Sequence, residues 1–476
     1  METILDPNKP LIVDLVIRGG WLLTLNPERT IYEDGFIAID GSVVVAVGDN
    51  SSLGSSYIGR KEISAHGNVV TPGLANGHRH ILSGPRGASP EGLVTLDVLR
   101  KVFYPSFAAL TEDDMYTYAV HHSAEMLRFG QTLFQEPGCS FLSAVMEGIA
   151  TVGIRCRTGP WTWDHAGPSS KTLPSSWMKM DTESCIKRLQ DGLHTVNAFG
   201  NSRIRDAVTI EGVGTCSDEL TKAAAELAKE ANSICVMHKA TSEQEVEIEL
   251  EIFGQRPVEH MYHIGALNEH VFLNHMTALE HFEVDMIADT GAVISHNPSS
   301  SLRLAKGTSQ TGKWPELLDA GVTVMLGTDA ENASDYHDIC RSMHLAALLP
   351  RDARRDPTVM PAELVVEMAT LQGAKAMRWD DELGSIEVGK QADLTIFDTN
   401  DFDWRPLHNP ISNLVYSSTG HSVDTVIIGG DILVENHSLI HIDEQQLRHD
   451  VEMIERRILT EIGIDPSPVW PVVPIR

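Results

Sequence analysis

The stretch that decides the fold is residues 69–80, VVTPGLANGHRH, an apolar run that ends in a His-Arg-His triplet. Residues i and i+2 of an extended segment point to the same side, so the imidazoles of His78 and His80 can reach one metal ion while Arg79 points away. The spacing alone is weak evidence, because a chain with 21 histidines contains such pairs by chance. A histidine pair in the core or on the surface is therefore the competing interpretation of this triplet.

Three later apolar runs also end in side chains that can bind a metal ion or a substrate. They lead to His238, to His275 and to Asp329. Helical patterns separate such runs, and in residues 218–232 the apolar side chains recur on one helical face. Repeated strand–helix units predict a parallel sheet, and residues 68–384 are long enough for eight of them. The pattern favours a (β/α)8 barrel over an open sheet.

In such a barrel the reactive side chains collect at the carboxyl ends of the strands. The histidine pair of the triplet, His238 and Asp329 are therefore expected to meet. Three neutral imidazoles and one carboxylate suit a divalent zinc or iron ion that keeps an open position for water.

The two ends of the chain are rich in short strands. Asp40-Gly41 is a strong hairpin signal between two apolar runs. Similar runs with glycine-rich turns recur near the other end, so residues 1–67 and 385–440 are expected to form one composite β domain. Residues 441–476 contain an amphipathic helix and a tail that we expect to pack on the outside of the barrel.

Composition narrows the class of partner. The chain has 37 Lys+Arg and 66 Asp+Glu, and its formal net charge of −29 repels phosphate backbones and anionic lipid heads. Six cysteines without a C-x-x-C pair favour reduced thiols in a cytoplasm. The start does not resemble a signal peptide, and no apolar stretch is long enough to span a bilayer. We expect a cytoplasmic protein with a small-molecule substrate and without nucleic acid or membrane partners.

Several motifs together resemble the amidohydrolase superfamily, in particular its cytosine-deaminase-like branch of triazine hydrolases and chlorohydrolases, the ATZ/TRZ group. The resemblance covers nearly the whole chain in order. The motifs that carry it are residues 72–80 (PGLANGHRH), 215–220 (TCSDEL), His238, Asn274-His275, 295–300 (SHNPSS), 326–329 (LGTD) and 389–394 (GKQADL).

The resemblance implies a distorted (β/α)8 TIM barrel with a small composite β-sandwich domain from both termini. It also implies that one divalent metal ion per chain binds to a single set of ligands, and that His275 contacts the metal-bound water or the substrate oxygen. Zinc is the first expectation, and iron, cobalt and manganese remain open. Members of this family commonly form homo-oligomers, so a homo-oligomer is also expected. The implied ligands are His78, His80, His238 and Asp329.

The site predicts hydrolysis by water activated on the metal. A metal ion can lower the pKa of bound water from 15.7 to about 7. Asp329 can take the proton from that water, and His275 can polarise a carbonyl or stabilise an oxyanion.

One position departs from the family pattern. Deaminases of this branch usually carry His-x-x-Glu after the fifth strand, and that glutamate protonates a ring nitrogen. Here Thr241 follows His238 at this spacing, and threonine cannot deliver that proton. Glu243 is a possible substitute, but as a first-turn helix residue it is expected to be solvated.

This departure favours a metal-dependent hydrolase that cleaves a C–N bond of a small neutral urea, amide or carbamate. An aryl-urea herbicide is one possible substrate, with phenylurea and molinate hydrolases as the nearest likeness. The alternative is an aminohydrolase or chlorohydrolase of an N-heterocycle, such as a triazine, pyrimidine or purine deaminase. A third possibility is a barrel that has lost catalysis and serves in assembly, although all four expected ligands are present.

Five residues are candidates for contact with substrate, each with a structural alternative. Trp161 and Trp163 lie in a loop that could form an apolar wall or simply pack shut. The remaining candidates are Gln135 at the end of the third strand, Thr241, and His296 in the Ser-His-Asn-Pro turn.

Overall fold

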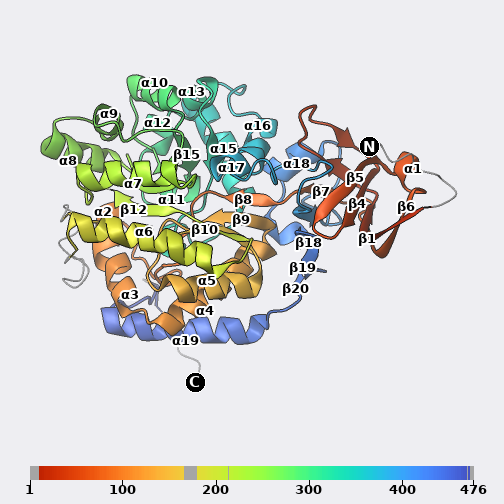
Figure 1. The fold of residues 1–476 in the computed structure, drawn as a ribbon, viewed down its shortest axis with the longest axis horizontal. Helices are drawn as coiled ribbons and strands as arrows, with labels where there is room; N and C mark the ends of the chain where they lie inside the picture. The colour runs from red at the N-terminus through yellow and green to blue at the C-terminus, as the bar shows by residue number, and fades with distance from the viewer. Residues whose placement is uncertain (1–9, 166–179, 213, 469, 472–476) are drawn as a thin grey trace.

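The computed structural model describes residues 10–165, 180–212, 214–468 and 470–471. Figure 1 shows a large α/β part on the left and a smaller β part on the right. The strands of the larger part are β8 (Leu74–Asn76), β9 (Gln131–Gln135), β10 (Arg155–Thr158), β11 (Ile204–Asp206), β12 (Val208–Gly212), β13 (Cys235–Lys239), β14 (Val271–His275), β15 (Val293–His296) and β16 (Val324–Leu326).

These strands form two parallel sheets, β11-β10-β9-β8 and β12-β13-β14-β15-β16. The first and last strands meet where the N–H of Gly77 donates to the carbonyl of Leu326 at 2.7 Å. At the other seam an isolated bridge joins Thr162 to Ile210 in β12. The predicted distorted (β/α)8 barrel is therefore confirmed, with its distortion concentrated at the two seams.

Helices cover the outside of the barrel, and their sequences explain where they begin. In α7 (Asp218–Glu230) the hydroxyl of Ser217 accepts a hydrogen bond from the N–H of Leu220, and the expected apolar face is buried. The other helices of the larger part are α2 (Thr95–Val98), α3 (Tyr104–Ala109), α4 (Glu112–Arg128), α5 (Leu142–Val152), α6 (Thr182–Phe199), α8 (Glu243–Phe253), α9 (Pro257–His263), α10 (His281–Thr290), α11 (Pro298–Arg303), α12 (Thr308–Thr311), α13 (Trp314–Asp319), α14 (Glu331–Ser334), α15 (Ile339–Arg354), α16 (Ala362–Met368) and α17 (Leu371–Ala376). Of these, α2 lies at the pocket, which Thr95 lines.

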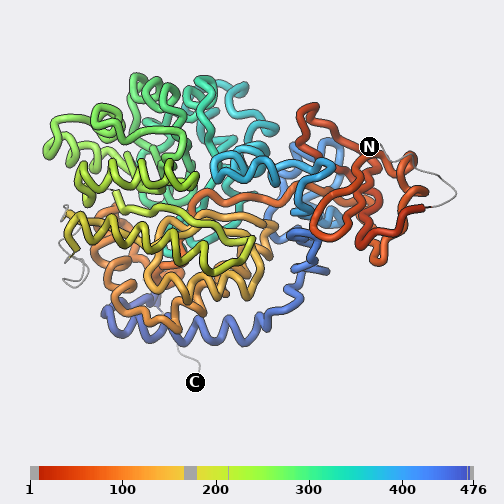
Figure 2. The backbone as a smooth tube through the Cα atoms, in the orientation of Figure 1, coloured from red at the N-terminus to blue at the C-terminus, as the bar shows by residue number. Residues whose placement is uncertain are grey.

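The smaller part is a β sandwich built from both ends of the chain, as predicted. One sheet has the order β5-β4-β1-β6 and the other β20-β19-β18-β17-β7-β2-β3. Figure 2 shows the red N-terminal and blue C-terminal segments lying together there. The elements are β1 (Leu11–Arg18), β2 (Trp21–Leu23), β3 (Ile31–Tyr32), β4 (Gly35–Asp40), β5 (Val43–Asp49), α1 (Asn50–Leu53), β6 (Tyr57–Ser64), β7 (Val69–Pro72), β17 (Leu394–Phe397), β18 (Val423–Ile428), β19 (Asp431–Glu435) and β20 (Ser438–Leu439). Between β17 and β18, α18 (Pro410–Tyr416) packs on α15 and α16 of the larger part.

The position of β7 differs from the sequence-based domain boundaries, which place residues 68–384 in the barrel. β7 pairs with β17 and β2, so it belongs to the sandwich. The apolar run of residues 69–76 is interrupted at Gly73, where a Cβ atom would lie 2.0 Å from the hydroxyl oxygen of Thr132. The break lets one short run supply a strand to each part of the molecule, and the barrel begins at β8.

The helix expected near the C-terminus is α19 (Glu444–Ile462), and it lies along α3 and α4 (Figure 1). Arg457 forms a salt bridge with Asp114, and the carboxylate of Glu455 accepts a hydrogen bond from the N–H of Arg86. In the described ranges, none of the helices has the length and apolar character needed to cross a bilayer.

A buried ion pair joins the two parts. Arg155 at the start of β10 donates from Nε to Oδ2 of Asp393 at 2.7 Å and from Nη2 to Oδ1 at 2.9 Å. Both side chains are 5% exposed, and the N–H of Gly429 also donates to Asp393. Removing one partner of such a pair leaves an uncompensated buried charge.

We therefore expect Arg155→Leu to destabilise the protein by about 3–5 kcal/mol. A lowered thermal midpoint in scanning calorimetry would report this loss. Lys187→Leu breaks the exposed Lys187–Asp191 pair and should change the midpoint little. Equal effects of the two variants would contradict the structural role of the buried pair.

Candidate metal centre and active site

Four side chains from three strand ends converge at one end of the barrel. His78 and His80 follow β8, His238 lies in β13, and Asp329 follows β16. Oδ1 of Asp329 lies 3.5 Å from Nε2 of His78 and 3.8 Å from Nε2 of His80. The Nε2 atoms of His80 and His238 are 3.2 Å apart. The structure thus brings the predicted ligands close together: the ligand atoms of His78, His80 and Asp329 lie within 4.8 Å of one another, as do those of His78, His238 and His275.

The spacing of these atoms fits a metal ion. Two ligands that each lie about 2.1 Å from zinc are about 3.4 Å apart in tetrahedral geometry. Neither ring nitrogen of His78 makes a hydrogen bond to the described residues, although the side chain is fully buried. A buried imidazole without a hydrogen bond is costly unless another ligand satisfies it, and a metal ion does so.

The charge states also suit metal binding. Burial lowers the pKa of His78 to about 4 and that of His80 well below its ordinary value. Burial alone would raise the pKa of Asp329, but His275, His78 and Lys306 hold it well below its usual range. Neutral imidazoles and an ionised carboxylate are the forms that bind a divalent cation.

Glu211, at the end of β12, orients His238. Nδ1 of His238 lies 2.9 Å from the backbone oxygen of Glu211 and 3.3 Å from its Oε2. Burial would lower the pKa of His238, but Glu211 raises it above its ordinary value. The proton is therefore held on Nδ1, and Nε2 is left to face the metal position.

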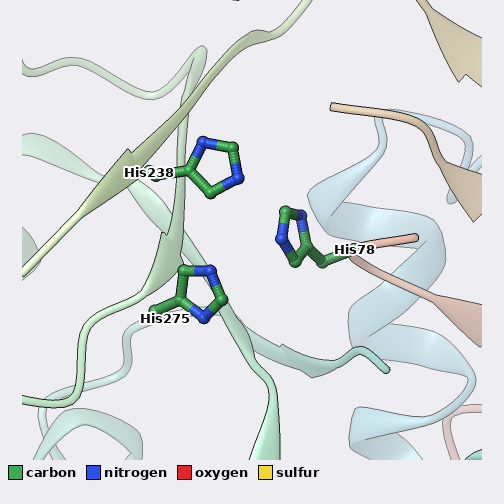
Figure 3. A group of neighbouring side chains, drawn as sticks. All are labelled: His78, His238 and His275. Atoms are coloured by element: carbon green, nitrogen blue, oxygen red, sulfur yellow. The ribbon is translucent and has the colours of Figure 1, made fainter. Parts of the chain in front are cut away.

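His275, at the end of β14, is the third imidazole beside His78. Figure 3 shows the ring of His78 facing the rings of His238 and His275, with ring centroids 5.0 Å and 4.9 Å away respectively. Nε2 of His275 lies 3.7 Å from Oδ2 of Asp329. His275 therefore lies beside Asp329, and its contact with a metal-bound water or with the substrate oxygen stays a prediction.

Two hydrogen-bond donors determine the tautomer of His275. Nδ2 of Asn297 lies 3.2 Å and Nζ of Lys306 3.3 Å from Nδ1 of His275. The hydroxyl of Ser295 donates to Oδ1 of Asn297, so the amide nitrogen is the atom that faces the ring. Nδ1 must accept, the proton of the neutral ring lies on Nε2, and Nε2–H points to the reacting side.

Two of the site residues have a left-handed backbone. The φ angle is +80° at His275 and +69° at Asp329. Non-glycine residues adopt this region at a cost, and such strain is concentrated at functional sites. The N–H of Asp329 donates to the carbonyl of His78 at 2.7 Å, which ties the last strand end to the first.

The five residues predicted to contact the substrate lie in different parts of the site. Trp161 and Thr241 line the pocket above the metal position, together with Leu99, Phe103, Phe107 and Leu304. Trp163 lies against Trp161, with ring centroids 4.6 Å apart, and lines the neighbouring cavity.

Gln135 and His296 lie deeper than the pocket wall. Gln135 is fully buried, and its side-chain oxygen and nitrogen have no hydrogen-bond partner in the described part of the chain. His296 stacks on Trp314 at a centroid distance of 3.7 Å. Neither residue is among those lining the pocket, and their contact with substrate stays a prediction.

The pocket is lined by threonine, and not by glutamate, at position 241. Glu243 is exposed in the first turn of α8, as the sequence analysis expects of a solvated helix residue. Among the pocket-lining residues that the structure describes, the carboxylates are Asp329 and Glu211.

Sequence reasoning missed Glu211 and Lys306. Glu211 closes the apolar run Val208–Ile210, so the rule applied to the other strand ends could have found it. Lys306 follows α11 in a loop, and no strand pattern marks it.

The comparisons agree with this geometry. A model of the amidohydrolase family matches residues 69–433. The 5-methylthioadenosine/S-adenosylhomocysteine deaminase of Syntrophobacter fumaroxidans is 32% identical over 449 residues, 94% of this chain and 98% of that relative. The structure of an adenosine deaminase from Xanthomonas campestris with bound zinc matches with a TM-score of 0.87 and 27% identity, covering 95% of this chain and 100% of that chain. An atrazine chlorohydrolase from Arthrobacter aurescens shares the fold, with a TM-score of 0.79, 23% identity, and coverage of 93% of this chain and 100% of that chain.

The chain therefore belongs to the amidohydrolase family. It is an enzyme for carbon–nitrogen bonds other than peptide bonds, as predicted. The finer likeness to phenylurea and molinate hydrolases finds no support in these relatives, which are named as deaminases and a chlorohydrolase.

The contact between Glu211 and His238 can be tested through metal affinity. We expect Glu211→Gln to weaken zinc binding by about tenfold or more, because outer partners of metal ligands typically contribute 10–100-fold. Competition with a chromophoric chelator would measure the change. Glu243→Gln, an exposed control, should bind zinc as the unsubstituted protein does; an unchanged affinity in Glu211→Gln would show that the backbone oxygen orients the ring alone.

Proposed function

We propose that the protein is a zinc-dependent aminohydrolase that removes an exocyclic amino group from a small N-heterocycle. The observation that carries this is the convergence of His78, His80, His238 and Asp329 beside a donor imidazole, His275, in a chain whose full-length relatives are named as deaminases of adenine nucleosides. This was the alternative in the sequence analysis, and the relatives favour it over a urea, amide or carbamate substrate.

The four convergent side chains would hold one divalent ion. When bound there, zinc supplies Lewis acidity that lowers the pKa of a water molecule to about 7. Elemental analysis of protein purified with several metals would decide between zinc, iron, cobalt and manganese.

The two oxygens of Asp329 face different partners. Oδ1 faces His78 and His80, while Oδ2 lies 3.7 Å from both Nε2 of His275 and Nζ of Lys306. Oδ1 is thus suited to hold the metal, and Oδ2 is suited to accept a proton from the attacking water. The proton can then pass to the amino group that leaves.

His275 acts on the other side of the reacting carbon. Its Nε2–H can donate to the oxygen that attacks and stabilise the negative charge of the tetrahedral state. A C–O bond forms, the C–N bond breaks, and the amino group departs as ammonia with the proton carried by Asp329.

A second candidate function is hydrolysis of a small urea, amide or carbamate. Thr241 supports it, because this residue supplies no acid for a ring nitrogen, and a carbonyl substrate needs none.

Product analysis separates the two candidates. We expect zinc-loaded protein to release ammonia from aminated pyrimidines, purines or triazines with the ring retained, measured by an ammonia assay and mass spectrometry. Asp329→Ala should lower kcat by orders of magnitude, since it loses a metal ligand and the proton acceptor together. Asp319→Ala, exposed at the end of α13, should retain activity. An aryl amine from a phenylurea, without ammonia from any heterocycle, would contradict the proposal.

The missing glutamate gives a gain-of-function test. We expect Thr241→Glu to fold and to raise the rate of ammonia release from a heterocycle by at least about tenfold, because a positioned acid contributes 10²–10⁴-fold. Thr241→Gln has the same size without the acid and should show no gain. A gain of the same size in both variants would mean that shape, and not the proton, limits the reaction.

A further inference from the structure

Trp161, which the sequence analysis considers only as an apolar wall, also donates a hydrogen bond towards the metal centre. Its Nε1–H donates to Oε2 of Glu211 at 2.8 Å. The two residues are 7% and 4% exposed. The same carboxylate oxygen lies 3.3 Å from Nδ1 of His238. One oxygen atom of Glu211 therefore lies between the wall of the pocket and an expected metal ligand.

The backbone at the seam of the barrel brings Trp161 and Glu211 together. The N–H of Glu211 donates to the carbonyl of Thr162 at 3.0 Å, and the N–H of Trp161 donates to the carbonyl of Cys139 at 3.1 Å. Thr162 also forms the isolated parallel bridge with Ile210. The segment that follows β10 thus runs beside β12, and this places the indole next to the carboxylate.

On its other side β12 approaches β13 closely at His238. Gly212 follows Glu211 with a φ angle of +83°, and a Cβ atom there would lie 2.0 Å from the carbonyl oxygen of His238. Glycine is the residue that permits such an approach. The main chain of Glu211 is therefore fixed against His238, and its carboxylate is the part that other side chains must position.

Aromatic neighbours hold the indole in place. The rings of Phe107 and Trp163 lie edge-on to that of Trp161, with centroids 5.8 Å and 4.6 Å away and interplanar angles of 76° and 64°. The hydroxyl of Tyr104 lies 3.5 Å from Oε1 of Glu211. The last torsion of a glutamate is broad, so its carboxylate takes the orientation that its partners impose. A packed indole is suited to impose one.

The pocket wall alone does not require tryptophan at this position. Phenylalanine would supply an aromatic face without a polar atom, whereas a buried indole N–H needs an acceptor. Glu211 is that acceptor, and a hydrogen bond to a carboxylate is charge-assisted. The choice of tryptophan therefore points to the contact with Glu211.

We propose that Trp161 is a positioning residue of the metal centre: its indole N–H holds the carboxylate of Glu211, and this carboxylate holds His238 with Nε2 towards the metal ion. The inference rests on the ligand set of the proposed function and adds a residue that determines metal affinity. Because Trp161 also lines the substrate pocket, one side chain serves both the wall of the pocket and the binding of the metal.

Zinc affinity, measured without substrate by competition with a chromophoric chelator, tests this role. Trp161→Phe keeps an aromatic wall and removes the donor. We expect it to weaken zinc binding by about threefold or more, a smaller loss than the 10–100-fold typical of a direct partner of a metal ligand. An unchanged zinc affinity would overturn the proposal.

A double-mutant cycle shows whether Trp161 acts through Glu211. Glu211→Leu removes the carboxylate and cannot accept the hydrogen bond from the indole. In this background we expect Trp161→Phe to change zinc affinity by less than about twofold, because residues that act through one contact are not additive. The same loss in both backgrounds would mean that Trp161 acts independently of Glu211, and the proposal would be wrong.

Trp314→Phe is the matched control. Trp314 is also buried, at 2% exposure, and its Nε1–H donates to the hydroxyl of Thr308 at 3.1 Å. Its loss should leave zinc affinity unchanged, because Glu211 keeps its donor. An equal loss of zinc affinity in Trp314→Phe would show a general loosening of the barrel and would count against a specific role of Trp161.

Because zinc affinity is measured without substrate, the experiment separates this inference from the aminohydrolase function. If zinc affinity follows the expected pattern while no heterocycle releases ammonia, only the aminohydrolase function is refuted. If heterocycles release ammonia while Trp161→Phe keeps its full zinc affinity, only the role of Trp161 is refuted.

Discussion

The active site depends on the close approach of three imidazoles, those of His78, His80 and His238, and the carboxylate of Asp329. Both ring nitrogens of His78 are buried without a hydrogen bond to the described residues, and a cation bound between these side chains would satisfy one of them. These residues come from strand ends far apart in the chain. Oδ1 of Asp329 lies 3.5 Å from Nε2 of His78 and 3.8 Å from Nε2 of His80, and the Nε2 atoms of His80 and His238 are 3.2 Å apart. Burial keeps His78 and His80 neutral, and the strained backbone of Asp329 presents its carboxylate to them. The parallel barrel supplies the rigid frame that such a concentration of buried polar atoms requires.

Further hydrogen bonds orient two of the imidazoles, those of His238 and His275. Glu211 accepts a hydrogen bond from Nδ1–H of His238, so that Nε2 of this ring faces the other imidazoles. Asn297 and Lys306 face Nδ1 of His275 and thereby place its proton on the reacting side. The two histidines therefore have opposite tautomers, one suited to bind a metal and the other to donate a hydrogen bond, which is the difference that hydrolysis of a C–N bond needs.

Two residues of the pocket stand apart from the features discussed so far. Thr241 stands where a deaminase of this branch usually has glutamate, and Lys306 adds a buried lysine side chain to the same pocket. Family membership gives the class of reaction, which is hydrolysis of carbon–nitrogen bonds other than peptide bonds.

The sequence determined the repeated strand–helix pattern, the composite β domain and the identity of the five convergent residues, because each depends on local periodicity or on which residue closes an apolar run. It could not place β7 in the sandwich, since a break at one glycine in a continuous apolar run leaves no mark in periodicity. Nor could it find Lys306, which enters the pocket from a loop. Hydrogen-bond partners and the burial of single charges depend on contacts between distant segments, and those exist only once the barrel has closed.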